Sequence, residues 1–158
     1  MGKNLKAEGL QITKHSGGNY PRHATHGGVL DSGEHTWEVL LTAAANSNGN
    51  LTMYIGVGRE ALDVEKGGHH KADAWYLRTD NGTLCGGGEV ASEQPIAFAV
   101  GDRIGVRMNC DDGSLRFCKN GEAMDAGFPA GTITGPVVGA VELVCIGQAL
   151  TLVPATLA

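Results

Sequence analysis

The sequence predicts an all-β protein, a two-sheet antiparallel β-sandwich with little or no helix. Short segments in which apolar and polar side chains alternate recur at even spacing, which is typical of half-buried strands. Glycine is frequent, with 25 among 158 residues and no collagen-like period, which indicates many turns and bulges. The 3.6-residue period of a helix fits only one or two turns, around residues 60–65.

Two strands are predicted in the segments HTWEVLL, residues 35–41, and LTMYIGV, residues 51–57. In each segment every second side chain is large and apolar, so one face is expected to be buried. The preceding segment, residues 15–35, is rich in Gly, His and Ser and is predicted to form a long ordered arm and loop.

A hairpin is predicted where Trp75 and Leu77 share the apolar face of one strand. Asn81-Gly82 supplies the turn that brings the chain back, so that glycines 86–88 lie opposite these large side chains. Glycine in a strand permits a close approach by a neighbour. We therefore expect these glycines to make room for Trp75.

Two turns between residues 102 and 128 predict a three-strand antiparallel meander. Asp-Gly and Asn-Gly are the pairs that two-residue type I′ hairpin turns prefer, because both turn positions need a positive φ. A turn at Asp112-Gly113 predicts three cross-strand pairs: Cys110 with Leu115, Met108 with Phe117, and Asn109 with Arg116.

The second turn, at Asn120-Gly121, predicts pairs that agree with the first. It sets Phe117 opposite Met124, Arg116 opposite Asp125, and Lys119 opposite Glu122. Both turns therefore bury Phe117 and place opposite charges across from each other. A slip of one residue would turn every side chain of a strand to the wrong face, so this register is predicted for both hairpins.

The last strands are predicted in the segment PVVGAVELV, residues 136–144, and in ALTLV, residues 149–153. A strand at the very C-terminus can pair with an early one, which favours a sandwich of two antiparallel sheets over a barrel.

Composition narrows the class of function. The net charge of −5 and the absence of a basic stripe disfavour nucleic-acid and membrane-surface binding. No apolar leader or membrane-length segment is present in the sequence, so we expect the cytoplasm, with the nucleus as an alternative. The four cysteines form no Cys-x-x-Cys pair, which predicts reduced, mostly buried thiols and no zinc site.

Together these segments resemble a SPRY domain from about residue 28 to residue 153. The resemblance is carried by SGEHTWEV (32–39), MYIGVGRE (53–60), AWYLRTDNGTL (74–84), FAVGDRIGVRMNCDDGSLRFCKNGE (98–122) and GPVVGAV (135–141). It implies a bent two-sheet sandwich of the concanavalin or jelly-roll type and a protein-interaction module without catalysis. Residues 1–27 are expected to be an N-terminal arm and first strand of the same single domain, and residues 28–158 its SPRY-like sandwich.

Motifs for catalysis and cofactors are weak. The segment GVGREA, residues 56–61, fits a dinucleotide fingerprint, but that site needs a long helix in a parallel βαβ unit, so a strand-end turn is the preferred interpretation. His69 and His70 are adjacent and point to opposite sides of an extended chain. His35 is expected to make a structural hydrogen bond where its strand begins. We expect no enzyme, no cofactor and no bound metal.

The resemblance implies that a ligand binds on three loops at one end of the sandwich, residues 14–23, 65–71 and 144–147. The candidate ligand-binding residues on these loops are Lys14, Tyr20, Arg22, His23, His69, His70, Val144 and Ile146. Tyr20 and Arg22 are the leading candidates, because aromatic and arginine side chains dominate most binding hot spots. The alternative for Tyr20 is packing of the arm against the sheet.

The leading hypothesis is a non-catalytic module that binds a short peptide segment of another protein and is monomeric as an isolated domain. The alternatives are a carbohydrate-binding, lectin-like sandwich and a structural or oligomerisation domain. Sugar binding usually exposes a tryptophan, yet Trp37 and Trp75 are in phase with apolar neighbours and are expected to be buried. Arg103, Arg107 and Arg116 are expected on a solvated outer face, with an anionic-peptide surface as the alternative.

Overall fold

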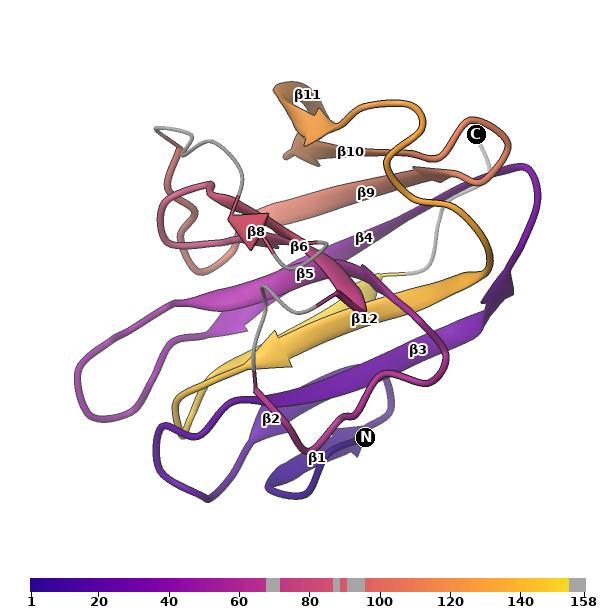
Figure 1. Cartoon of the computed structure of the whole chain (residues 1–158). Helices are drawn as coiled ribbons and strands as arrows, with labels where there is room; N and C mark the ends of the chain where they lie inside the picture. The colour runs from indigo at the N-terminus through magenta and orange to yellow at the C-terminus, as the bar shows by residue number, and fades with distance from the viewer. Residues whose placement is uncertain (68–71, 87–88, 91–95, 154–158) are drawn as a thin grey trace.

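The computed structural model describes residues 1–67, 72–86, 89–90 and 96–153. Within these ranges, thirteen strands form two antiparallel sheets that pack face to face, and no helix is present (Figure 1). The prediction of an all-β, two-sheet sandwich is therefore confirmed. No helix of the described part could span a membrane.

One sheet has seven strands and contains both ends of the described chain. Its order is β1 (Leu5–Glu8), β2 (Gln11–Lys14), β13 (Ala149–Val153), β4 (Glu34–Ala43), β9 (Arg103–Asn109), β10 (Ser114–Lys119) and β11 (Glu122–Phe128). The C-terminal strand β13 lies between β2 and β4. This confirms the prediction that the last strand pairs with an early one.

The second sheet has six strands. Its order is β3 (Arg22–Leu30), β12 (Val137–Leu143), β5 (Met53–Gly58), β6 (Ala74–Arg78), β7 (Leu84–Gly86) and β8 (Glu89–Val90). Strand β3 lies in the segment that was predicted to be an arm and loop, so that prediction is wrong. The strand RHATHGGVL has little apolar alternation of its own and is held by pairing with the apolar strand β12.

The main core lies between the two sheets. Side chains that are completely or almost completely buried come from both inner faces: Val39, Leu41, Ile55, Val57, Leu77, Ile104, Val106, Met108, Phe117, Leu143 and Leu150. Burying an aliphatic or aromatic side chain of this size stabilises the folded state by roughly 1.5–3 kcal/mol. This core holds the sheets as a rigid support for the loops at their ends.

The six-stranded sheet is also covered on its outer face. A second cluster there contains Tyr54, Ala74, Tyr76, Cys85 and Ala140, with Leu62 packed against it. Figure 1 shows the connection between β5 and β6 crossing in front of β12 and β3, and the His23 backbone N–H donates to Val64 O of that connection at 2.9 Å. Strand β5 was predicted to be half-buried, but every residue of it is buried, because this crossing connection closes the outer face.

The predicted Asn120-Gly121 turn is confirmed. Asn120 and Gly121 have φ values of 51° and 86°, and Lys119 pairs with Glu122. Beyond Cys118, a β-bulge shifts the register, so that Arg116 faces Gly127 instead of the predicted Asp125. The predicted pairing of Phe117 with Met124 is lost for the same reason.

The Asp112-Gly113 hairpin has a longer loop than predicted. The pairs are Asn109 with Ser114, Met108 with Leu115, Arg107 with Arg116 and Val106 with Phe117, so the predicted pairs of Cys110, Met108 and Asn109 are wrong. Asn109 causes the change, because its Oδ1 accepts the backbone N–H groups of Asp111 and Asp112 at 2.9 and 3.1 Å. The shift is two residues, so Met108 and Phe117 keep the buried face that was predicted.

The predicted role of glycine opposite Trp75 is confirmed at Gly86. Gly86 pairs with Trp75, and a Cβ on Gly86 would lie 2.6 Å from the indole Cδ1. Glycines 87 and 88, which the same prediction included, lie outside the described residues. The side chain of Trp75 is only 5% exposed.

Candidate functional site

Three loops that are far apart in sequence meet at one place on the molecule. The backbone N–H of Gly147 donates to Lys14 O at 2.9 Å, which joins the third loop to the first. The Arg22 guanidinium donates through Nη1 to Glu65 O at 3.1 Å, which joins the first loop to the second. The structure therefore brings together the described parts of the loops from which the candidate residues come.

Lys14 ties two of these loops together from inside. Its side chain is fully buried, and its Nζ donates to Gly18 O at 2.7 Å and to Val144 O at 2.9 Å. Burial, together with the nearby Arg22 charge, lowers the pKa of Lys14. Lys14 therefore braces the site and does not present its ammonium group to a partner.

Tyr20 is the exposed part of the site, whereas Arg22, the other leading candidate, is buried and supports the Tyr20 ring. The Arg22 guanidinium lies 4.0 Å from the centroid of the Tyr20 ring, a cation–π contact. Arg22 is only 7% exposed, and its Nε lies 3.3 Å from Glu65 Oε2, whereas Tyr20 is 54% exposed. The structure therefore presents an aromatic ring to solvent on a nearly buried, charge-compensated support.

The third loop adds a small apolar surface. Ile146 is 36% exposed, and its carbonyl accepts the Asn46 backbone N–H at 3.0 Å. Val144 is partly buried against the outer cluster of the six-stranded sheet. Of these two candidate residues, Ile146 offers a partner the more exposed surface.

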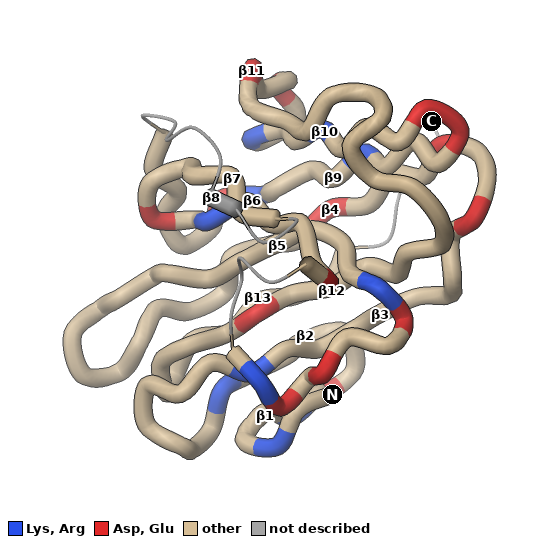
Figure 2. The backbone as a smooth tube through the Cα atoms, in the orientation of Figure 1, with Lys and Arg blue, Asp and Glu red and all other residues tan. Residues whose placement is uncertain are grey.

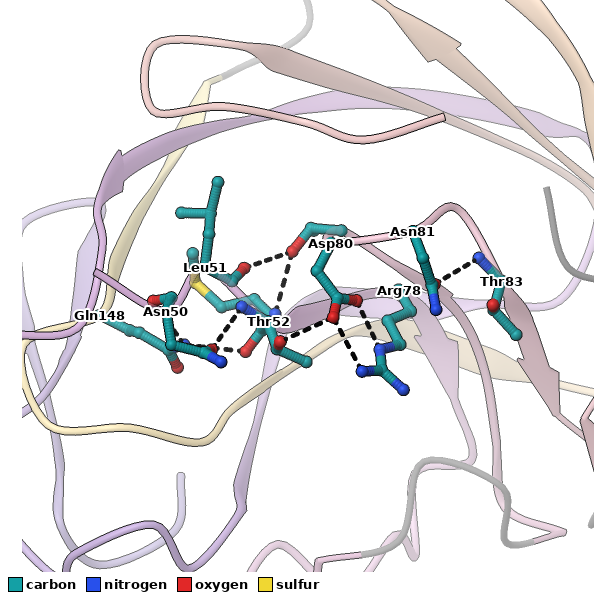
Figure 3. A network of polar contacts seen from close by, with 10 residues as sticks. Asn50, Leu51, Thr52, Arg78, Asp80, Asn81, Thr83 and Gln148 are labelled. Carbon is teal, nitrogen blue, oxygen red and sulfur yellow. Dashed lines mark hydrogen bonds and ion pairs between the residues drawn. The ribbon is translucent and has the colours of Figure 1, made fainter. Parts of the chain in front are cut away.

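Gln148 fixes the shape of this loop and was missed by the sequence analysis. Its Oε1 accepts the backbone N–H groups of Val144 and Cys145 at 2.8 and 2.9 Å, and its Nε2 donates to Thr52 O at 2.9 Å and to Asn50 (Figure 3). No sequence signal marks it, because a glutamine beside a loop is usually solvated. Its role depends on segments nearly a hundred residues apart.

The same network continues to an ion pair at the β6–β7 turn. Asp80 pairs with the Arg78 guanidinium and accepts the Thr52 hydroxyl at 3.0 Å (Figure 3). Partial burial raises the pKa of Asp80, but hydrogen bonds from Arg78 and Thr52 outweigh burial and hold that pKa below its usual value. The charged form of Asp80 is therefore the form that supports the loop from 50 to 52.

His23 lies beneath the site and is buried. Its Nδ1 is 2.8 Å from the Tyr76 hydroxyl, and its Nε2 is 3.9 Å from Glu142 Oε1. Burial and the nearby Glu142 charge raise the pKa of Tyr76, so its phenol stays protonated. His23 thus belongs to a buried polar cluster that supports β3, and its ring is not on the surface.

Among the residues that the structure describes, the other histidines give no sign of a metal centre. His69 and His70 were predicted to contact the ligand, but they lie outside the described residues. Within the described residues, no three His, Cys, Asp or Glu side chains gather as metal ligands would. His35 makes the predicted structural hydrogen bond, donating through Nε2 to Ser32 O at 2.7 Å.

The glycines of residues 56–61 serve packing. Gly56 lies inside β5, where a Cβ would approach the Trp75 carbonyl oxygen to 2.0 Å, and the chain turns after Gly58 without forming a helix. A dinucleotide site needs a helix N-terminus at this point. The strand-end turn interpretation is therefore confirmed.

The three arginines of the seven-stranded sheet lie on its exposed outer face. Arg103 and Arg107 are 3.8 and 3.2 Å from the carboxylates of Glu38 and Glu34, while Arg116 faces Arg107 on the next strand. Figure 2 shows acidic and basic residues interspersed along the backbone. These glutamates partly neutralise the arginines, which agrees with the solvated-face interpretation.

A comparison with known families identifies the class of protein. Residues 34–153 match the model of the SPRY domain, so the chain belongs to the SPRY family. SPRY domains are generally non-catalytic protein–protein interaction modules. No curated protein sequence matches the chain significantly.

Solved structures share the fold at low sequence identity. The SPRY domain of human HERC1 is 18% identical with a TM-score of 0.81, and the match covers 99% of this chain and 96% of that one. A human SPRY domain is 20% identical with a TM-score of 0.77, covering 98% of each chain. The TRIM65 PSpry domain is 15% identical with a TM-score of 0.75, covering 98% of this chain and 88% of that one.

Proposed function

We propose that this domain recognises a short peptide segment of a partner protein on the surface formed by the loops 14–23, 65–67 and 144–147. The observation that carries the proposal is the exposed Tyr20 ring, which lies against the buried Arg22 guanidinium, itself paired with the exposed Glu65. An aromatic anchor on a rigid support is the usual centre of a binding hot spot.

Recognition on this surface depends on shape and packing more than on charge. Glu65 compensates Arg22, and the Lys14 ammonium is buried among carbonyl groups, so neither cation is free to attract an anion. Tyr20 and Ile146 offer the exposed apolar area. We therefore propose that the peptide carries an apolar side chain that packs against Tyr20 and that no cofactor, metal or catalytic step takes part.

The net charge of −5 supports a protein partner over nucleic acid or a membrane surface. The carbohydrate alternative needs an exposed tryptophan for stacking. Trp75 is buried, and Trp37 is partly buried against the core between the sheets. Neither indole is presented on the loop surface, which favours the peptide proposal.

To test the proposal, peptides that bind the immobilised domain are selected from a random library. Their affinities for the wild-type domain and for variants are then measured. Tyr20→Ala should weaken binding of the selected peptides about tenfold or more, because loss of a hot-spot aromatic costs at least about 1.4 kcal/mol. Val29→Ala is the matched control, since Val29 is exposed and lies at the opposite end of β3 from Arg22. Unchanged affinity of every selected peptide for Tyr20→Ala would refute the site.

A further inference from the structure

A second concave region lies between the sheets, away from the three loops. Two adjoining hollows of about 150 and 210 Å³ share the lining residues His26, Gly27 and Trp37. Leu30 also lines the first hollow, and Leu10 and Leu152 also line the second. We call this region the His26–Trp37 cleft.

Glycines in β3 and β12 create the space. A Cβ on Gly139 would lie 2.3 Å from His26 Cε1, so only glycine lets the imidazole lie over β12. Gly27 has a φ of 73°, and the pairing of β3 with β12 shifts register beside it. The resulting bulge moves the edge strand away from its regular path. The cleft is therefore a consequence of the local sequence.

Two ring nitrogens of the residues that line this cleft lack hydrogen-bond partners within the described part of the chain. Trp37 Nε1 and His26 Nε2 are both buried, and neither is hydrogen-bonded within the described part of the chain. The two rings are nearly perpendicular, with centroids 5.8 Å apart. An unpaired buried donor or acceptor costs roughly 1–3 kcal/mol, whereas most buried polar groups in proteins are paired. A ligand that supplies the missing partners would recover this cost.

The lining indicates which ligand chemistry suits the cleft. Most lining residues are glycines or aliphatic residues, and Glu38 at the edge disfavours an anion. Burial lowers the pKa of His26 to about 4, so its imidazole is neutral near pH 7 and can donate or accept at Nε2. A cavity of roughly 150 Å³ holds a benzene ring.

We propose that the His26–Trp37 cleft binds a small uncharged molecule with an apolar ring and a carboxamide. The carboxamide oxygen accepts the Trp37 Nε1–H, and its NH₂ group donates to His26 Nε2. Both nitrogens are covered in the structure, so the ligand reaches them only when lining side chains move, and Leu10, which lines the second hollow, is 49% exposed. This site is independent of the loop surface, and either one can fail without the other.

The two tryptophans make the test direct, because Trp37 and Trp75 give the only indole N–H signals in a ¹⁵N-correlation spectrum. Titration with benzamide should move the Trp37 signal saturably and leave that of Trp75 unchanged. Toluene, which has the ring but no carboxamide, should bind about tenfold more weakly, since two hydrogen bonds are lost. His26→Phe should weaken benzamide binding by a similar factor.

A blocking variant supplies the control. Gly28 lines the first hollow, and a Cβ at this position would have open space around it. Its backbone φ lies outside the left-handed region, so Gly28→Leu fills the cleft without backbone strain. Gly28→Leu should abolish the benzamide shift, whereas a variant with Ala123→Leu, at an exposed position of β11, should bind benzamide as the wild type does. Three results would each overturn the proposal. They are a Trp37 signal that does not shift up to the solubility limit of benzamide, equal affinities for toluene and benzamide, and unchanged benzamide binding by the Gly28→Leu variant.

Discussion

Individual buried polar side chains hold the loops of this domain in place. Lys14, Arg22 and Gln148 each bond to the backbone of another loop, and each is nearly or completely buried. Hydrogen bonds from charged groups stabilise by roughly 1.5–3 kcal/mol each. Such bonds fix the loop conformation before a partner arrives, which lowers the entropy lost on binding.

The Asp80 carboxylate leads to a prediction for the pH dependence of stability. Its pKa is below the usual 3.8 in the folded state, so its contribution is fully present above the unfolded value and is lost as pH falls through the folded value. The difference in free energy of unfolding between wild type and Asp80→Asn should therefore be constant from neutral pH down to about 4 and shrink in more acidic solution. Urea unfolding at a series of pH values measures this difference.

The control for this experiment is Asp31→Asn, which removes an exposed carboxylate outside the network. It should have a small effect on the free energy of unfolding throughout. If the difference in free energy of unfolding between the wild type and Asp80→Asn grew below pH 4, the role given to Asp80 would be contradicted.

Residue type made Tyr20 and Arg22 the leading candidates, because aromatic and arginine side chains are common hot-spot anchors. The structure exposes Tyr20, but Lys14, Arg22 and His23, which were predicted to face a ligand, are buried. The carbonyl that receives the Lys14 ammonium belongs to Val144, and the hydroxyl beside His23 belongs to Tyr76. Partners so distant in sequence cannot be inferred from the local pattern.

Among the elements, β5 and β6 approach each other closely at a glycine. Gly56 pairs with Tyr76, and its missing side chain leaves room for the backbone of Trp75. Backbone cannot move aside as a flexible side chain can. Gly56 therefore controls how these strands of the six-stranded sheet pack.

We predict that Gly56→Ala destabilises the domain by about 3 kcal/mol or prevents its folding, because overpacking a rigid core site costs roughly 1–3 kcal/mol or more. Gly28→Ala is the matched control, since Gly28 lies in open space on β3, and its melting temperature should stay close to that of the wild type. Thermal unfolding followed by circular dichroism compares them. Equal melting temperatures for the two variants would show that the close approach at Gly56 is not constraining.

The two hairpins show why turn chemistry predicts some registers and not others. At Asn120-Gly121 the turn residues themselves adopt positive φ, so the local pair decides the turn. At Asp112-Gly113 the Asn109 side chain bonds to the following backbone and lengthens the loop. A competing side-chain interaction thus overrides the preference of the dipeptide.

At the scale of the whole molecule, the segment before the matched family region is part of the sandwich. Leu5 and Ile12 are core residues, and β2 pairs with the C-terminal strand β13. Lys14 then ties this edge to the loop after β12. The first strands therefore close one edge of the seven-stranded sheet and support the proposed binding surface.

Deletion of residues 1–14 should abolish cooperative unfolding, because it exposes β13 and removes two buried aliphatic side chains. The control is the double substitution Lys6→Ala and Glu8→Ala on the exposed face of β1, whose ion pair at 3.2 Å is in solvent and adds little. Calorimetry of both variants measures the result. A truncated domain that melts cooperatively near the wild-type temperature would show that β1 and β2 are dispensable.

The sequence by itself determined the two-sheet class, most strand positions, the faces of Met108 and Phe117 and the Asn120-Gly121 turn, because these depend on alternation and dipeptide conformation. Only the tertiary structure decided that β3 is a strand, that β5 is buried on both faces and that Lys14 and Arg22 join the three loops. Each of these depends on a partner far along the chain. Local sequence patterns determine the conformational preference of each segment, whereas packing of the whole core determines which distant segments pair with each other.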